Sequence, residues 1–227
     1  MHGGYAEYAL VGERSSVKLP VVLSLADGAL IEPLAVGLHA VDLARLTSDA
    51  RVLVLGAGPM ALAAIFWARR QGVGRIAVTA RTSRRATLAM QVGGDAFVPQ
   101  SGDLAGTVAE VLRGPPDVVF ECVGVPGLLA QAVDCVGPRG TVVVMGVCMV
   151  PDTLTPAVGT GKEVRIQHVM AYGVEDFRRV ADALDAGAAE PRGMVTDTVS
   201  LDALPTVFES RRRYTNQCKV LVDPWQG

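Results

Sequence analysis

The sequence has little of what marks the specialised classes of protein. Aromatic residues make up 5% of its 227 residues, and its formal net charge at pH 7 is only −2. A chain so close to neutral lacks the basic surface that nucleic acids and anionic membranes attract, so we expect neither as a partner. The four cysteines lie far apart, and no two have a close metal-ligand spacing such as Cys-x-x-Cys; they are Cys122, Cys135, Cys148 and Cys218.

Long hydrophobic runs are also missing. The most apolar stretch, Val52 to Ala68, falls short of the ~20 residues that a membrane-spanning helix needs, and it is interrupted by Gly56, Gly58 and Pro59. The first residues, MHGGYAEYAL, contain no basic segment followed by an apolar one, so they do not resemble a secretory signal. We therefore expect a cytoplasmic protein with reduced thiols, and half of its residues are hydrophobic, which is enough for a sizeable core.

The most informative stretch is RVLVLGAGPMALAAIFWARRQGVG, from Arg51 to Gly74. Its branched apolar start predicts a buried parallel strand, and its apolar second half predicts a helix. Between them, the glycines allow a tight turn that brings the backbone close to a pyrophosphate at the helix N-terminus. The third position of this Gly-x-Gly-x-x-Gly pattern is Ala61, which is still small. The residues expected to bind a dinucleotide here are Gly56, Ala57, Gly58, Pro59 and Met60.

Strands and helices alternate along most of the chain, which predicts an α/β fold with a doubly wound parallel sheet of the Rossmann type. The strands are expected at 51–55, 75–79, 96–98, 117–121, 140–145 and 164–169. The helices between and after them are expected at 59–71, 83–91, 103–112, 126–136 and 174–186. Other elements are expected as weak strands over 4–11 and 17–22, a helix over 28–46, a Pro-rich loop over 149–162, and a separate tail of strand 195–199, helix 201–212 and strand 219–222.

The choice of cofactor is readable at the end of the second strand of the sheet. An NAD site places an acid there to bond the ribose hydroxyls, but this chain has Ala80. The residues that follow could instead bond a 2′-phosphate; they are Arg81, Thr82, Ser83, Arg84 and Arg85. The sequence therefore favours NADP, with NAD still possible. The alternative is that the arginines near this point form a solvated helix face.

Several motifs together resemble the medium-chain dehydrogenase/reductase family, in its zinc-containing alcohol and polyol dehydrogenase branch. They are GGYAEY near the start, IEPLAVGLHAV at 31–41, VLGAGPMAL at 54–62, ECVGVPG at 121–127, GTVVVMGV at 140–147, KEVRIQHVMAYGVEDF at 162–177 and KVLVDP at 219–224. The resemblance covers essentially the whole chain. It implies that 1–46 is a remnant of a GroES-like catalytic domain, that 47–187 is the dinucleotide-binding domain, and that 188–227 returns to the catalytic domain.

The resemblance also implies roles for individual residues. It places Arg85 against the adenine of the cofactor, which leaves Arg81 and Thr82 as the better candidates for binding a 2′-phosphate. It also implies backbone contacts with the nicotinamide from Val123, Gly124, Gly146 and Val147. It puts Glu32 beside a catalytic zinc, as a candidate catalytic residue. The Cys and His zinc ligands of full-length relatives have no counterparts in this chain, so we expect no metal site from this chain alone. The alternative for Glu32 is an acid favoured by the start of a helix.

The function expected from these features is an alcohol or polyol dehydrogenase-like oxidoreductase, transferring hydride between a nicotinamide cofactor and a small-molecule secondary alcohol or ketone. The alternative is a truncated relative that binds dinucleotide without zinc-dependent redox chemistry, as a binding or oligomerisation module or a redox-neutral enzyme. Cys122 is expected to be a small buried residue, and His39 and His168 to be structural. The resemblance further implies at least a homodimer, joined through the edge strand at Val164 to Met170.

Overall fold

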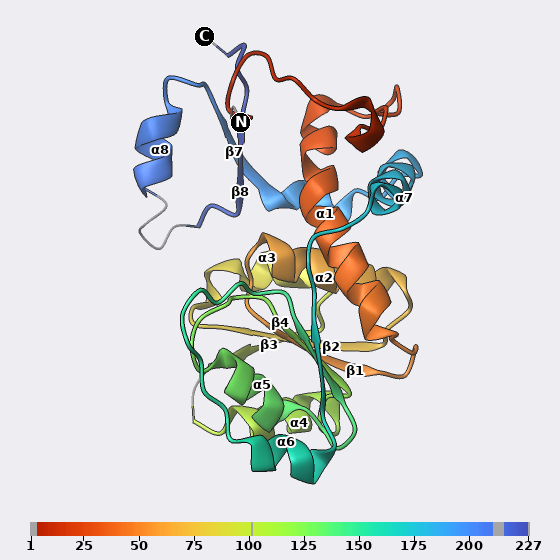
Figure 1. Ribbon diagram of the computed structural model, residues 1–227, viewed down its shortest axis with the longest axis vertical. Helices are drawn as coiled ribbons and strands as arrows, with labels where there is room; N and C mark the ends of the chain where they lie inside the picture. The colour runs from red at the N-terminus through yellow and green to blue at the C-terminus, as the bar shows by residue number, and fades with distance from the viewer. Residues whose placement is uncertain (1–3, 101, 211–215, 227) are drawn as a thin grey trace.

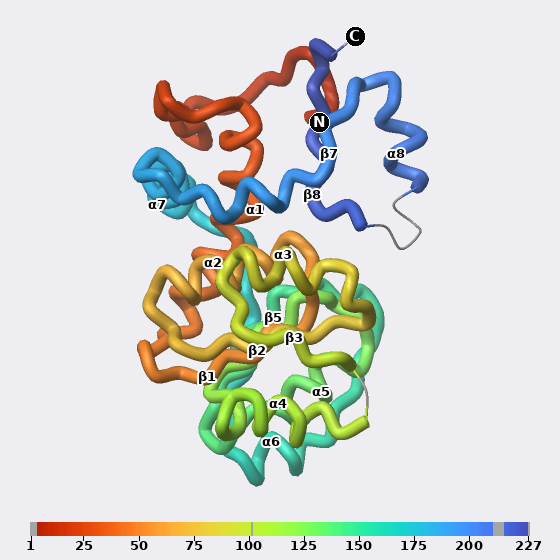
Figure 2. Tube along the Cα trace, turned by 180° about the vertical axis from the view of Figure 1, so that it is seen from behind, coloured from red at the N-terminus to blue at the C-terminus, as the bar shows by residue number. Residues whose placement is uncertain are grey.

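The structure is a computed structural model, and it describes residues 4–100, 102–210 and 216–226. The chain forms two lobes (Figure 1). The lower lobe holds a parallel sheet with helices on both faces, and the upper lobe combines segments from both ends of the chain, as the tube in Figure 2 also shows. No helix among the described residues is both long enough and apolar enough to cross a membrane.

The sheet has six parallel strands in the order β3-β2-β1-β4-β5-β6, which confirms the doubly wound fold. Its strands are β1 Arg51–Leu55, β2 Arg75–Ala80, β3 Ala96–Pro99, β4 Val118–Glu121, β5 Thr141–Val144 and β6 Arg165–His168. The order reverses between β1 and β4, and in open parallel sheets ligands bind at such a point, outside the carboxyl ends of the strands. The predicted site therefore lies at the carboxyl ends of β1 and β4.

Side chains alternate between the two faces of the strands and divide the core into two clusters. Val52 and Val54 of β1 point to the face covered by α1, α2, α3 and α7, whereas Leu53 and Leu55 point to the face covered by α4 and α5. Every one of these four β1 side chains is nearly fully buried. The helices are α1 Leu25–Ala44, α2 Pro59–Arg70, α3 Ala86–Gln91, α4 Leu104–Leu112, α5 Leu128–Cys135, α6 Pro156–Lys162, α7 Val174–Asp185 and α8 Leu204–Ser210.

The long helix α1 passes from the upper lobe to the lower one (Figure 1). It begins earlier than the predicted 28–46, because Ser24 and Asp27 form a capping box in which each side chain accepts from the other residue's backbone amide. The Asp27 carboxylate also forms an ion pair with Nε of Arg192 at 2.7 Å. Arg192 lies in the short 3-10 helix Glu190–Met194. The pairing fastens the start of α1 to the segment that leads into the tail.

The tail forms its own two-stranded sheet, from β7 Val195–Val199 and β8 Lys219–Val222, which pair in parallel. This agrees with the expectation that the tail stays outside the main sheet. The helix between them, α8, is shorter than the predicted 201–212, whose last two residues lie outside the described ranges.

Two predictions for the connecting segments are wrong. Neither 4–11 nor 17–22 forms a strand in the described part of the chain, because neither segment has a strand to pair with. The residues of 4–11 are all exposed, and those of 17–22 are exposed or half-buried. The loop predicted over 149–162 contains α6. Pro156 suits its first turn, and Nζ of Lys162 at its end donates to the carbonyl oxygens of Val133, Asp134 and Val136 at 3.1, 2.7 and 3.0 Å.

Candidate functional site

A cavity of about 310 Å³ lies at the carboxyl ends of β1, β2 and β4. It brings together most of the residues that the sequence assigns to the cofactor: Gly56, Ala57, Gly58, Ala80, Arg81, Thr82, Arg85 and Val123. Its volume is near the lower limit of ligand pockets in proteins, so it suits half of a dinucleotide better than a whole one.

The glycine turn between β1 and α2 has the geometry of a phosphate site. Gly56 has φ of +118°, which favours glycine, and its amide donates to the carbonyl of Thr79 at 2.7 Å. A Cβ at Gly58 would meet no atom within 4 Å, so the surface there is open to a ligand. Among the described residues, the amides of Met60 and Ala61 at the start of α2 have no backbone acceptor. They remain available for an anion, which fits a pyrophosphate.

Two buried polar atoms at the same cavity also lack a partner among the described residues. Oγ1 of Thr79 and Nε of Arg85 are both buried, and neither makes a hydrogen bond. The remaining nitrogens of Arg85 donate to the carbonyl oxygens of Ala57, at 3.4 Å, and Gln217, at 2.5 Å. Arg85 therefore links the glycine turn to Gln217, two positions before β8. The unpaired Oγ1 of Thr79 and Nε of Arg85 could form hydrogen bonds with a polar ligand in the cavity.

The other predicted nicotinamide contacts line a second cavity, of about 340 Å³, which shares Val125 with the first. Gly124, Gly146 and Val147 lie there. The two loops touch so closely that a Cβ at Gly146 would come 2.1 Å from the amide nitrogen of Gly124. The buried carboxylate of Glu121 accepts from the amides of Val123, at 2.7 Å, and Gly124, at 2.9 Å, and so fixes the loop after β4.

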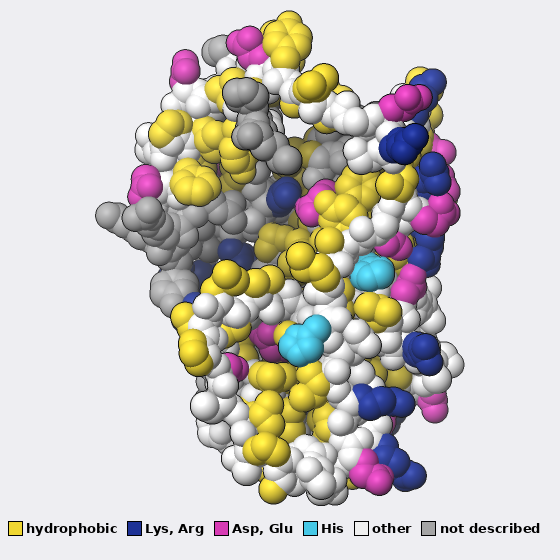
Figure 3. Space-filling view, viewed as in Figure 1, with side chains coloured by type: hydrophobic (Ala, Val, Ile, Leu, Met, Phe, Trp, Pro, Cys, Tyr) yellow, Lys and Arg dark blue, Asp and Glu magenta, His cyan; other side chains and the backbone are white. Residues whose placement is uncertain are grey.

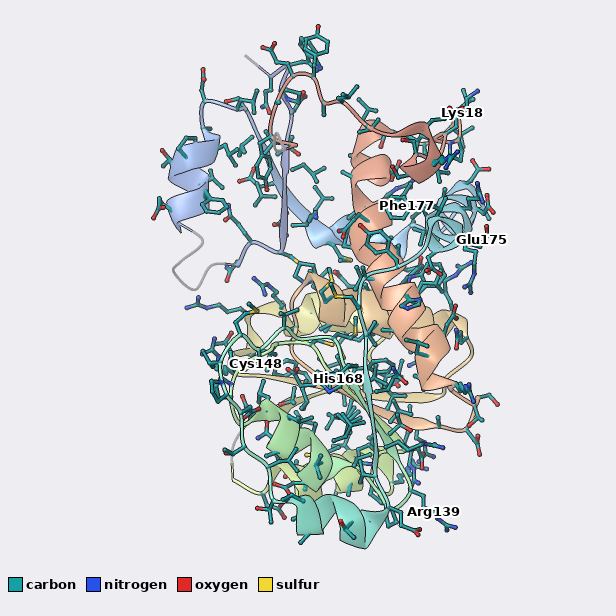
Figure 4. All side chains as sticks on the ribbon, viewed as in Figure 1. Lys18, Arg139, Cys148, His168, Glu175 and Phe177 are labelled. Atoms are coloured by element: carbon teal, nitrogen blue, oxygen red, sulfur yellow. The ribbon has the colours of Figure 1, made fainter. Side chains whose placement is uncertain are left out.

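His168 is exposed at the second cavity, although the sequence analysis expects it to be structural. Figure 3 shows a histidine among apolar side chains in the middle of the lower lobe, and Figure 4 labels His168 at this place, with Cys148 nearby. His39 does have a structural contact, because its Nδ1 lies 3.5 Å from the Asp176 carboxylate.

Pro59 and Met60 lie away from the first cavity. Their side chains line an apolar groove of about 260 Å³ between the start of α2 and the tail, together with Tyr5, Val207, Phe208 and Val220. For these two residues, only the main chain adjoins the glycine turn. Their assignment to the cofactor stays a prediction.

Glu32 is exposed on α1, next to Tyr172. Burial raises the pKa of the Tyr172 phenol, and the Glu32 carboxylate raises it further. A tetrahedral zinc needs three or four protein ligands. In the described ranges, no group of three or more His, Cys, Asp or Glu side chains lies together, so these residues do not fit a zinc ion.

Cys122 and Cys135 do not supply a nucleophile. Burial raises the pKa of the Cys122 thiol well above its usual value, and the neighbouring Glu121 raises it further. Burial likewise raises the pKa of Cys135 to about 11. A thiol in such an environment stays protonated and unreactive at neutral pH, as expected for Cys122 from the sequence.

Other cavity residues do not belong to the predicted set. They are Leu55, Thr79, Gln100, Cys122, Val125, Leu128 and Gln131. Gln100 directly follows the last residue of β3, so the rule that ligands bind at the carboxyl ends of parallel strands could have found it. Nothing local in the sequence marks Gln131, because it reaches the cavity from the middle of a helix.

Comparison with known proteins places this geometry in a family. The profile of the family described as zinc-binding dehydrogenase matches residues 59–186. The (R,R)-butanediol dehydrogenase of Bacillus subtilis is 30% identical over 98% of this chain and 64% of its own length, and the sorbitol dehydrogenase of Bos taurus is 28% identical over 86% and 56%. The chain thus spans less than two thirds of these relatives.

A solved structure from Sinorhizobium meliloti 1021, described as a zinc-binding dehydrogenase bound to NADP, superposes with a TM-score of 0.90. It is 33% identical, and the match covers 98% of this chain and 66% of that one. The similarity extends over both lobes of the structure.

Proposed function

Because the chain belongs to the zinc-binding dehydrogenase family, we propose that it binds a nicotinamide dinucleotide, NADP in preference to NAD, as part of an oxidoreductase acting on secondary alcohols and ketones. The observation that carries this proposal is the first cavity, where the glycine turn meets Ala80, Arg81 and Thr82. The cofactor, when bound, supplies hydride transfer to or from the carbinol carbon.

The chain's own residues would bind and orient the two halves of the cofactor. The free amides at the start of α2 would hold the pyrophosphate, with Arg81 and Thr82 at the 2′-phosphate and Ala80 offering no carboxylate to repel it. The second cavity would receive the nicotinamide half, against the loops that Glu121 fixes. The neighbour solved with NADP supports this choice of cofactor.

The proposed substrate class comes from the relatives, whose names refer to butanediol and sorbitol. The apolar side chains of Val125, Leu129 and Val147 line the second cavity together with the polar side chains of Asp152 and His168, which suits a small alcohol near the nicotinamide. Because the described donor set does not fit zinc, no step of the reaction is assigned to a metal.

The test is a fluorescence titration of the purified chain with NADPH and NADH, followed by incubation with NADP⁺ and (R,R)-butanediol or sorbitol. Binding with formation of NADPH supports the whole proposal. Binding without turnover supports the dinucleotide site alone and favours a binding module. Absence of binding contradicts both.

A further inference from the structure

Two glutamines from different elements meet at the first cavity. Nε2 of Gln100, just after β3, donates to Oε1 of Gln131 in α5 at 2.9 Å, and both residues line the cavity. No other hydrogen bond of either side chain occurs among the described residues. Their remaining amide atoms are free to meet a ligand.

A hydrogen-bonded pair of carboxamides always leaves the same two functions unused. The amide that donates keeps its carbonyl oxygen as an acceptor, and the amide that accepts keeps its NH₂ group as a donor. This holds whichever way the two amides are oriented. The pair therefore presents one acceptor and one donor side by side.

The position of the pair agrees with the place of a nucleotide base. β3 is the strand next to β2 in the sheet. With the ribose at Ala80, at the end of β2, the base would extend toward the end of β3, where Gln100 lies. Val125 and Leu128 supply apolar walls for a flat ring in the same cavity.

We propose that the Gln100–Gln131 pair binds the Watson–Crick edge of the cofactor's adenine, and so selects the base. The exocyclic N6 amino group of adenine donates to the free carbonyl oxygen, and its N1 accepts from the free NH₂ group. This inference rests on the proposed dinucleotide function, and it adds a contact that the glycine turn and the 2′-phosphate site do not provide.

The experiment compares NADP⁺ with its 1,N6-etheno derivative, in which a two-carbon bridge removes the N6 donor and the N1 acceptor. Binding is measured by calorimetry for the unmodified chain, Gln131→Leu and Gln100→Leu. The unmodified chain should bind the etheno derivative about tenfold more weakly, from the loss of two neutral hydrogen bonds. Each variant should bind NADP⁺ about tenfold more weakly than the unmodified chain does, and the etheno derivative with almost unchanged affinity. The ratio of the affinity for NADP⁺ to the affinity for the etheno derivative should therefore fall from about ten to about one.

Gln71→Leu is the matched control, because Gln71 also bonds a side chain, that of Asp42 at 3.1 Å, but lies outside the cavity. It should keep the ratio of the unmodified chain. If the two variants also keep that ratio, the etheno bridge acts only by its size and the proposal is overturned. The same follows if the unmodified chain binds both compounds equally, whereas failure to bind either one overturns the proposed function itself.

Discussion

Gly37 of α1 lies directly against Ala63 of α2, so close that a Cβ added at Gly37 would come 2.5 Å from the Cβ of Ala63 and 2.7 Å from its carbonyl carbon. Close by, the indole nitrogen of Trp67 donates to the carbonyl of Leu34 at 2.8 Å. The two contacts set the distance between α1 and α2. Since α2 starts at the glycine turn, they also support the position of the candidate site.

The first prediction tests this helix contact. Gly37→Ala should lower the free energy of unfolding by about 1 to 3 kcal/mol, because the new methyl group meets backbone that cannot move aside cheaply. Gly161→Ala is the control: it lies in α6 with nothing within 4 Å of the added Cβ, and it should stabilise by about 0.4 to 1 kcal/mol. Urea unfolding followed by circular dichroism measures both. Equal effects of the two substitutions would contradict the close contact.

A second prediction concerns the pH dependence of an ion pair at the start of the sheet. Nε and Nη2 of Arg51 donate to the two oxygens of Asp117 at 3.0 and 2.7 Å, and these bonds hold the pKa of the carboxyl below its usual 3.8. A lowered pKa means that the pair contributes stability above pH 3.8, and that the contribution is lost as the pH falls through the lowered value.

Asp117→Asn should therefore cost about 1 kcal/mol at pH 7, a modest value because both side chains are partly exposed to screening solvent. The difference from the unmodified chain should shrink as the pH falls below the usual pKa of 3.8 and through the lowered one, as measured by urea unfolding at each pH. Asp202→Asn is the control, because Asp202 is exposed and makes no ion pair in the described part of the chain. A cost that stays constant down to pH 2 would refute the prediction.

The third prediction concerns cofactor choice. Arg81→Ala should weaken NADPH binding about 10- to 100-fold and leave NADH binding nearly unchanged, because only NADPH carries the phosphate that Arg81 would bond. Fluorescence titration measures both affinities. Arg70→Ala, at the far end of α2, serves as the control and should change neither. Equal affinities of the unmodified chain for NADPH and NADH would show that NADP is not preferred.

The fourth prediction concerns assembly. β6 pairs only with β5 in the described sheet and so forms its edge. Ile166 on this edge is 41% exposed and Met170 beyond it 87%. We expect two chains to pair through β6, since an open edge strand templates pairing with another. Ile166→Asp should shift the protein to monomer in analytical ultracentrifugation, with Leu43→Asp on α1 as the control. A monodisperse monomer for the unmodified chain would exclude the pairing.

The main sheet was predictable because the residues of its strands are themselves apolar enough to show that the strands are buried. Val52 to Leu55 are branched and apolar on both faces, and the glycines that follow end the strand in a turn that only glycine forms easily. α6 was not predictable, because its two internal glycines argue against a helix and the Lys162 contacts that hold it come from residues far away in the sequence.

The candidate site likewise contains residues that could be predicted from the sequence and residues that could not. Residues at the carboxyl end of a strand could be predicted from the sheet alone; examples are Ala80, the last residue of β2, and Gly146, two positions after β5. Gln131 could not, since its place at the cavity depends on how α5 packs against the sheet. The exposure of His168 could not be predicted for a related reason, because it depends on β6 being at the edge of the sheet.

The ring of Tyr8 packs edge-on against that of Trp225, with 5.7 Å between their centroids, so the upper lobe joins segments more than two hundred positions apart (Figure 2). A ribosome delivers residues in order, at about 5 to 20 per second. The six strands of the lower lobe, which end at His168, are therefore synthesised before β8, so the contact between Tyr8 and Trp225 can form only after every strand of the sheet has been made.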